Sequence, residues 1–184
     1  MKIFAIYLNV ELVKKPEWLD EFRKKYDKPY EIHITLKQPC YIEEDRISEL
    51  REKVLNYFNS INISKHKIEI TFDEILRNKD KEGVTIMIKA SNPDDLIKIQ
   101  KELCYYLNEY TNYVKFKYQD YENNFVPHIT IARNLSEIQE IDAQKYLQND
   151  FVCCGEISSV TLSIVNNNTP EESKKSTNQT VYSL

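Results

Sequence analysis

Glycine is nearly absent from this chain, which has only Gly83 and Gly155 among its 184 residues. The loops that cradle phosphates in P-loop proteins and in Rossmann dinucleotide-binding proteins need several glycines within a few positions, because the backbone must approach the phosphate closely. The sequence therefore excludes both of these protein classes.

Metal-binding cysteine patterns and long apolar runs are also missing. The four cysteines have no zinc-ligand spacing, and the adjacent Cys153 and Cys154 are poorly placed for a disulfide with each other, so we expect reduced thiols in a cytoplasmic protein. The apolar run at residues 3–8 is too short to cross a membrane and has no cleavage pattern behind it. We expect a first strand there, and no membrane partner.

The chain lacks a strong excess of either charge. Charged residues make up 29% of the sequence, but the formal net charge is only −4, which argues against binding a DNA duplex or another long nucleic acid through its phosphates. A small nucleotide or an RNA end stays compatible, because such a ligand needs only local positive charge. The length of 184 residues indicates one moderate domain or two small fused lobes, which we expect to act as a monomer.

What the chain does have is the tripeptide His-Ile-Thr twice, at residues 33–35 and 128–130, each time within a strand-like apolar run. Because side chains alternate along a strand, the His and Thr of each copy point to one face and the Ile to the other. Two such pairs facing each other supply a general acid, a general base and two hydroxyl donors for a phosphate oxygen. The candidate catalytic residues are therefore His33 and His128, and the candidate phosphate-binding residues are Thr35 and Thr130.

Chance is a poor explanation for this repetition. The chain has three histidines and nine threonines, so the chance that two of the three histidines have Thr two positions later is about one percent. The alternative is a pair of ordinary half-buried strands whose polar face carries His and Thr. His66, the third histidine, lacks the motif, and we expect it to be solvated where a strand begins.

Hydrophobic periodicity predicts the same order of elements twice, which indicates a duplication with lobes at about 1–80 and 81–184. The predicted elements of the first half are strands near 2–9, 30–37 and 66–76 and helices near 16–26 and 44–59. Those of the second half are strands near 84–90, 125–132 and 157–165 and helices near 94–110 and 136–148.

Two segments lie outside the repeat. Alternation over 158–165 and 177–184 predicts a closing pair of strands, joined by a polar loop. The segment 111–124 has no counterpart in the first half and carries four aromatic side chains, Tyr113, Phe116, Tyr118 and Tyr121. We expect an extra strand and turn packed on the sheet there, and the alternative is a platform on which bases stack.

The His-X-Thr-X motifs at residues 33–36 and 128–131 resemble those of the two-histidine (2H) phosphoesterase superfamily. Residues 127–133, Pro-His-Ile-Thr-Ile-Ala-Arg, are especially similar to its branch of 2',3'-cyclic nucleotide phosphodiesterases and bacterial 2'-5' RNA ligase-like proteins. Through the order of its elements, the resemblance spans nearly the whole chain. It implies that residues 1–184 form a single domain. It implies a bilobal, duplicated α+β fold in which two antiparallel-rich sheets face each other across a central groove, with helices on the outer faces.

The chemistry of a cyclic phosphodiester agrees with these motifs. Its hydrolysis needs a water molecule deprotonated on one side of phosphorus and the departing sugar oxygen protonated on the other. Imidazole suits both tasks because its ordinary pKa is about 6.5. We therefore predict a phosphodiesterase that opens the 2',3'-cyclic phosphate of a nucleotide or RNA end to a 2'-phosphate. No metal or other cofactor is expected, since two histidines without Asp, Glu or Cys at ligand spacing make a poor zinc site.

The resemblance also implies a division of roles. By this resemblance, His128 is the base that activates water and His33 is the acid that protonates the leaving oxygen. A substrate bound in the reverse orientation would exchange these two roles. The alternation of side chains along a strand also separates the two nearby cations. Lys37 lies on the same strand face as His33 and Thr35, which allows it to reach the groove. Arg133 has the opposite parity and points away from the phosphate unless the strand ends or bulges at Ala132, so neither cation is included in the predicted site.

Other functions fit the same motifs. The site has the chemistry to act on a 2'-5' linkage, a cyclic oligonucleotide or ADP-ribose cyclic phosphate, and the loops around the groove would decide between these substrates. A further alternative is a nucleotide- or RNA-end-binding module without turnover, although binding alone would be served by Arg or Lys. The last is a structural domain whose repeat only records a duplication.

Overall fold

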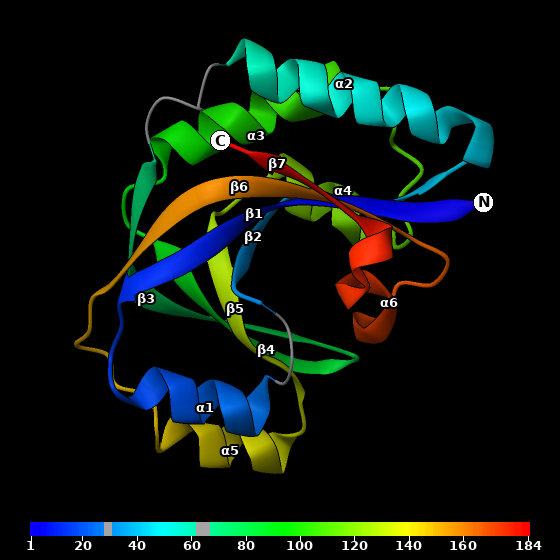
Figure 1. The fold of residues 1–184 in the computed structure, drawn as a ribbon. Helices are drawn as coiled ribbons and strands as arrows, with labels where there is room; N and C mark the ends of the chain where they lie inside the picture. Colours follow the sequence, from blue (N-terminus) through cyan, green and yellow to red (C-terminus); the bar gives the residue numbers. More distant parts are fainter. Residues whose placement is uncertain (28–30, 62–66) are drawn as a thin grey trace.

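One curved antiparallel sheet forms the centre of the computed structural model, which describes residues 1–27, 31–61 and 67–184 (Figure 1). Within these residues the sheet has seven strands, which are β1 (Lys2–Lys14), β2 (His33–Ile42), β3 (Ile68–Asp80), β4 (Gly83–Ala90), β5 (His128–Leu135), β6 (Cys153–Val165) and β7 (Gln179–Ser183). Their order is β2-β1-β6-β3-β4-β5, and β7 pairs with β6. The two motif strands therefore lie at opposite ends of this order.

The strand order is symmetric in the way a duplicated unit requires. Exchanging β1, β2 and β3 with β4, β5 and β6 turns the order into its own reverse. The two sheets expected on either side of a groove are two halves of one sheet, joined where Ile68–Phe72 of β3 pairs with Cys153–Ile157 of β6. Each half of the sheet takes its third strand from the other half of the chain, since β6 lies beside β1 and β3 beside β4.

Helices accompany this antiparallel sheet, which confirms the predicted α+β class. The helices are α1 (Trp18–Tyr26), α2 (Ile47–Ser60), α3 (Asp94–Tyr106), α4 (Lys117–Asn123), α5 (Glu137–Gln144) and α6 (Pro170–Lys174), with short 3-10 turns η1 (Glu44–Arg46) and η3 (Ser176–Asn178). In Figure 1, α1 and α5 lie at one end of the molecule and α2 and α3 at the other. Because α1 contacts β5 and α3 contacts β2, the helices support the two strands that carry the motifs.

β1 and β6 run further than local periodicity predicts. The predicted strand ends near residue 9 and its partner begins near 157, whereas β1 continues to Lys14 and β6 begins at Cys153. The added residues pair with each other, so the partner strand extends them. The predicted closing pair of strands is confirmed, because β6 pairs with β7, and the loop between them contains the short helix α6.

The segment 111–124 does not form the extra strand and turn that we predicted. It contains the helix α4, and its pairing with a strand is limited, among the described residues, to an isolated bridge between Tyr113 and Cys40. A buried contact favours this arrangement: the Glu122 carboxylate lies 2.6 Å from Lys37 Nζ and accepts a hydrogen bond of 2.7 Å from the Tyr113 hydroxyl. An ion pair with a distant strand therefore stabilises this segment in its position on β2.

Candidate active site

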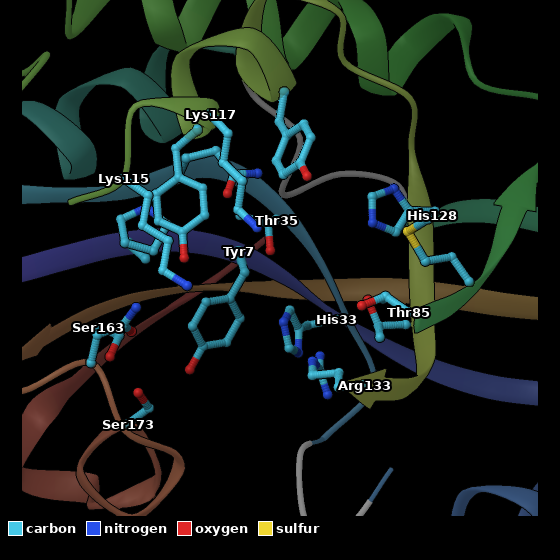
Figure 2. A pocket seen from close by; sticks show the side chains of 18 of the residues that line it. Tyr7, His33, Thr35, Thr85, Lys115, Lys117, His128, Arg133, Ser163 and Ser173 are labelled. Carbon is cyan, nitrogen blue, oxygen red and sulfur yellow. The ribbon is translucent and has the colours of Figure 1, made fainter. Parts of the chain in front are cut away.

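A pocket of about 790 Å³ lies between the two halves of the sheet, and the motif strands β2 and β5 both line it. These strands are far apart in the strand order, but the sheet curves so that they contact each other. All four candidate residues, His33, Thr35, His128 and Thr130, line the pocket. Figure 2 shows the two imidazole rings reaching it from different strands.

Each imidazole is held by the carbonyl two residues before it. Nδ1 of His33 lies 2.8 Å from the Glu31 carbonyl oxygen, and Nδ1 of His128 lies 2.6 Å from that of Val126. A carbonyl only accepts hydrogen bonds, so in the neutral ring Nδ1 carries the proton and Nε2 carries the lone pair. The same contact in both copies gives the two histidines the same tautomer.

Burial in the pocket disfavours the charged form of both rings. The pKa of His33 is lowered to about 4, mainly by desolvation, which the hydrogen bond to Glu31 opposes and to which the positive charge of Arg133 adds. Desolvation also lowers the pKa of His128, against the hydrogen bond to Val126. Both histidines are therefore neutral at pH 7 without a ligand, and a bound phosphate would favour protonation of one of them.

The threonine hydroxyls share the face of the histidines. Thr35 pairs across the sheet with Tyr7, and Thr130 pairs with Met87 in the equivalent position. The Tyr7 ring also packs against the His33 ring, with 4.9 Å between the ring centroids. The β-branched threonine side chains have few rotamers in a strand, which suits them to hold an oxygen at a set position.

A bulge follows the threonine in each motif strand. In β2, Thr35 pairs with Tyr7 of β1, and Lys37 pairs with Ile6, the residue next to Tyr7. β2 therefore has one extra residue between these two pairs. In β5, the partners of Thr130 and Ala132 are likewise adjacent residues of β4. A bulge shifts the alternation by one residue, so the side chain two positions after each threonine faces the core instead of the pocket.

Lys37 does not reach the groove, contrary to the parity argument. Because of the bulge, its side chain points into the core, where it is only 1% exposed and pairs with Glu122 at 2.6 Å. Its ammonium group also lies 3.4 Å from the Tyr113 hydroxyl. This cation therefore holds α4 against β2 and takes no part in the pocket.

Arg133 lines the pocket, so the outward orientation expected for an unbroken strand does not apply. The bulge at residues 131–132 is the exception that the parity argument allowed, and it turns Arg133 toward the histidines (Figure 2). Its guanidinium donates a hydrogen bond of 2.6 Å to the buried carboxylate of Asp27, which also accepts one of 3.0 Å from Arg23. The site thus contains a cation that the sequence analysis left out.

A comparison of the two motifs in the sequence indicates the orientations of Lys37 and Arg133. When the two motifs are aligned on their histidines, Lys37 corresponds to Ala132, and Gln38 corresponds to Arg133. Alanine is often fully buried, which indicates a core position, and both Gln38 and Arg133 line the pocket. Tyr7 had no comparable signal, because it follows no motif and only the pairing of β1 with β2 brings it to His33.

The pocket extends beyond the histidines toward two further walls. On one side it is lined by side chains from α4 and the turn before it and from the tip of the β3–β4 hairpin, which include Lys115, Lys117, Tyr118, Tyr121, Asp80 and Glu82. On another it is lined by polar side chains of β6 and of the segment around α6, which include Ser163, Ser173 and Gln179. Figure 2 shows Lys115 and Lys117 on the side away from His128.

In residues 1–27, 31–61 and 67–184, no group of three or more His, Cys, Asp or Glu side chains is placed to hold a metal ion. No helix in the same ranges has the length and apolar character needed to cross a bilayer. His66, predicted to be solvated, lies outside the described residues.

A duplicated α+β fold with two His-X-Thr strands lining one pocket defines the class of two-histidine phosphoesterases. The family model described as the 2'-5' RNA ligase superfamily matches residues 12–169. The chain belongs to this superfamily of 2H phosphoesterases, as the motifs predicted.

Individual relatives agree with this assignment. A protein of Staphylococcus aureus strain JH1, named "Putative phosphoesterase", is 32% identical over 133 residues, which cover 70% of each chain. A relative from strain MW2 of the same species has the same identity and coverage. Among solved structures, Kluyveromyces marxianus Usb1 with uridine monophosphate has a TM-score of 0.53 and 10% identity, over 99% of this chain and 98% of that one. A second Usb1 structure has a TM-score of 0.52 and 9% identity over the same shares, and both likenesses show the fold.

Proposed function

We propose that this protein hydrolyses the 2',3'-cyclic phosphate of a nucleotide or RNA end to a 2'-phosphate, without a metal ion. The observation that carries the proposal is the pair of histidines, His33 and His128, which line one pocket in the same tautomer. Hydrolysis of a cyclic phosphate requires a proton acceptor and a proton donor at the same phosphorus, and this pair supplies both. Two comparisons support the proposal. One relative is named a phosphoesterase, and one structure of Usb1 contains uridine monophosphate.

The reaction follows from the two rings. His128 Nε2 takes a proton from water as its oxygen attacks phosphorus, and the bond from phosphorus to O3' breaks. His33, protonated in the complex, gives its proton to O3', so the phosphate stays on O2' and the two rings have exchanged protonation states. The choice of His128 as the base rests on the family resemblance.

Three further residues stabilise the charge that develops on the phosphate. The Thr35 and Thr130 hydroxyls donate hydrogen bonds to its non-bridging oxygens. Arg133 adds a positive charge beside the His33 ring, since both side chains line the pocket next to each other (Figure 2). Preorganised donors of this kind typically contribute about 100- to 1000-fold in rate each.

Both walls of the pocket come from one chain, so a monomer contains the complete site. We also assign the enzyme to the cytoplasm, because all four of its cysteines, which lie in the described residues, are free thiols.

Turnover of 2',3'-cyclic mononucleotides in the presence of a chelator tests the proposal. We expect hydrolysis to the 2'-phosphate, and a loss of at least about 100-fold in kcat/KM for His33→Ala and for His128→Ala, because each removes a general acid or base. His66→Ala is the matched control, since that histidine stands outside both motifs. Binding without turnover by the unmodified protein would instead identify a binding module.

A further inference from the structure

We propose that Lys115 and Lys117 bind a second phosphate, on the 5' side of the terminal nucleotide, so that the preferred substrate is the cyclic-phosphate end of an RNA chain. This inference rests on the proposed function, because it extends the substrate from the same two histidines. It concerns the wall of the pocket formed by α4, the turn before it and the β3–β4 hairpin.

The pocket has room for more than the reacting group. Its volume of about 790 Å³ lies in the upper part of the range of about 300–1000 Å³ that holds drug-sized ligands. The histidines, threonines and Arg133 occupy one region, and the pocket continues past Tyr7 and Thr35 to Lys115 and Lys117 (Figure 2). A substrate centred on the histidines therefore reaches these lysines only if it extends beyond its cyclic phosphate.

The lysines carry the charge that a phosphate needs. Lys115 Nζ lies 2.5 Å from Glu82, and Lys117 binds Asp80 and lies 3.8 Å from Glu82, so the two cations form one cluster with two carboxylates. The side chains of this cluster remain between 31% and 39% exposed. Ion pairs with this exposure contribute only about 0–1 kcal/mol, so a phosphate that enters the pocket can replace the carboxylates.

Two phenol rings lie beside the lysines and fit the neighbouring nucleoside. Tyr118 and Tyr121 line the pocket, with 6.5 Å between their ring centroids. Lys115 and Lys117 each lie 5.9 Å from the centroid of one of these rings. Aromatic faces next to cations are typical of sites that hold single-stranded nucleic acid by stacking and charge together.

Variants of the carboxylates Asp80 and Glu82 distinguish phosphate binding by the lysines from a purely structural role of the ion pairs. If Lys115 and Lys117 bind a phosphate, Asp80 and Glu82 compete with it, so lysine and carboxylate variants have opposite effects. If the cluster only fastens α4 to the β3–β4 hairpin, removing either side of the ion pairs has the same effect. The direction of change therefore reports the role of the cluster.

The test compares uridine 2',3'-cyclic phosphate with the dinucleotide UpU that ends in a 2',3'-cyclic phosphate. We expect the unmodified protein to have a kcat/KM about tenfold higher for the dinucleotide, mainly through a lower KM, as for one added charged contact. Uridine 2',3'-cyclic phosphate with a 5'-phosphate is the third substrate, and most of the gain should appear with it, because the second phosphate carries the effect.

The variants measure the ratio of kcat/KM between the dinucleotide and the mononucleotide. We expect the double variant Lys115→Gln/Lys117→Gln to lower this ratio about tenfold, and Asp80→Asn/Glu82→Gln to raise it. Lys67→Gln is the matched control, since Lys67 is ion-paired with Glu156 but does not line the pocket. Its ratio should equal that of the unmodified protein.

A ratio near one in the unmodified protein, or equal losses on both substrates in the lysine and carboxylate variants, would overturn the proposal and leave the cluster as a structural fastening. Such a result differs from failure of the proposed function, in which neither substrate is hydrolysed or turnover survives the His33→Ala and His128→Ala substitutions.

Discussion

Arg133 Nη1 lies 2.6 Å from the Asp27 carboxylate, which joins the pocket side of β5 to the C-terminal end of α1. Asp27 is buried, and its second oxygen accepts a hydrogen bond of 3.0 Å from Arg23. The carboxylate therefore fixes the position of a guanidinium group that lines the pocket, so that little reorganisation is needed when a phosphate binds.

Replacement of this guanidinium should weaken catalysis. We expect Arg133→Gln to lower kcat/KM for a 2',3'-cyclic mononucleotide about 100-fold, because a fixed positive charge near the phosphate is lost. Arg133→Lys should recover part of the loss, since it restores the charge but not the planar pair of donors. Arg23→Gln is the control that disturbs the same carboxylate from outside the pocket, and an equal loss in it would contradict a direct role for Arg133.

The pH dependence should differ between the free enzyme and the complex. Burial lowers the pKa of His33 to about 4 and the pKa of His128 below its ordinary 6.5. The base must be neutral and the acid protonated, so kcat/KM, which reports the free enzyme, should peak between pH 4 and 6.5. A bound phosphate raises both pKa values, so the optimum of kcat should lie at higher pH. Coincident profiles for the two parameters would contradict this account.

The threonine hydroxyls should matter for rate rather than for folding. Thr35→Val and Thr130→Val keep a β-branched side chain in the strand and remove only the donor, so each should lower kcat/KM about 100-fold. The midpoint of urea unfolding should change little, because both residues are half-buried at the pocket. Thr85→Val is a useful comparison, since Thr85 lines the same pocket from β4 but belongs to neither motif. A loss in Thr85→Val as large as in the motif variants would contradict the proposed role of the motif hydroxyls.

The buried ion pair between Lys37 and Glu122 should matter for stability because each charge neutralises the other. Lys37→Met leaves the Glu122 carboxylate, whose side chain is 5% exposed, without its cation, and we expect a loss of about 3–5 kcal/mol in the free energy of unfolding. The double variant Lys37→Met/Glu122→Leu should be more stable than Lys37→Met alone, because no unpaired charge remains.

Lys89→Met is the control for that measurement. Lys89 pairs with Glu74 at 2.7 Å on the surface, with side chains 38% and 54% exposed, so its loss should change the free energy by less than about 1 kcal/mol. Urea unfolding followed by circular dichroism measures all three variants. Similar losses for Lys37→Met and Lys89→Met would show that burial of the pair does not matter.

The sequence by itself determined the features that depend on local alternation. His33 shares a strand face with Thr35, and His128 with Thr130, because successive side chains point to opposite sides of any strand. The duplicated order of elements and the closing pair β6–β7 follow from the same kind of pattern. The family follows as well, since its motifs are short and continuous in the chain.

Only the tertiary structure decided which residues complete the pocket. Bulges after Thr35 and Thr130 turn Lys37 into the core and Arg133 toward the histidines, and a bulge depends on the register with the neighbouring strand. The helix α4 forms where the sequence predicted a strand, and Glu122 of this helix is paired with a lysine 85 positions away in the chain. Periodicity describes how one strand alternates, whereas pairing between distant strands decides where that alternation is interrupted.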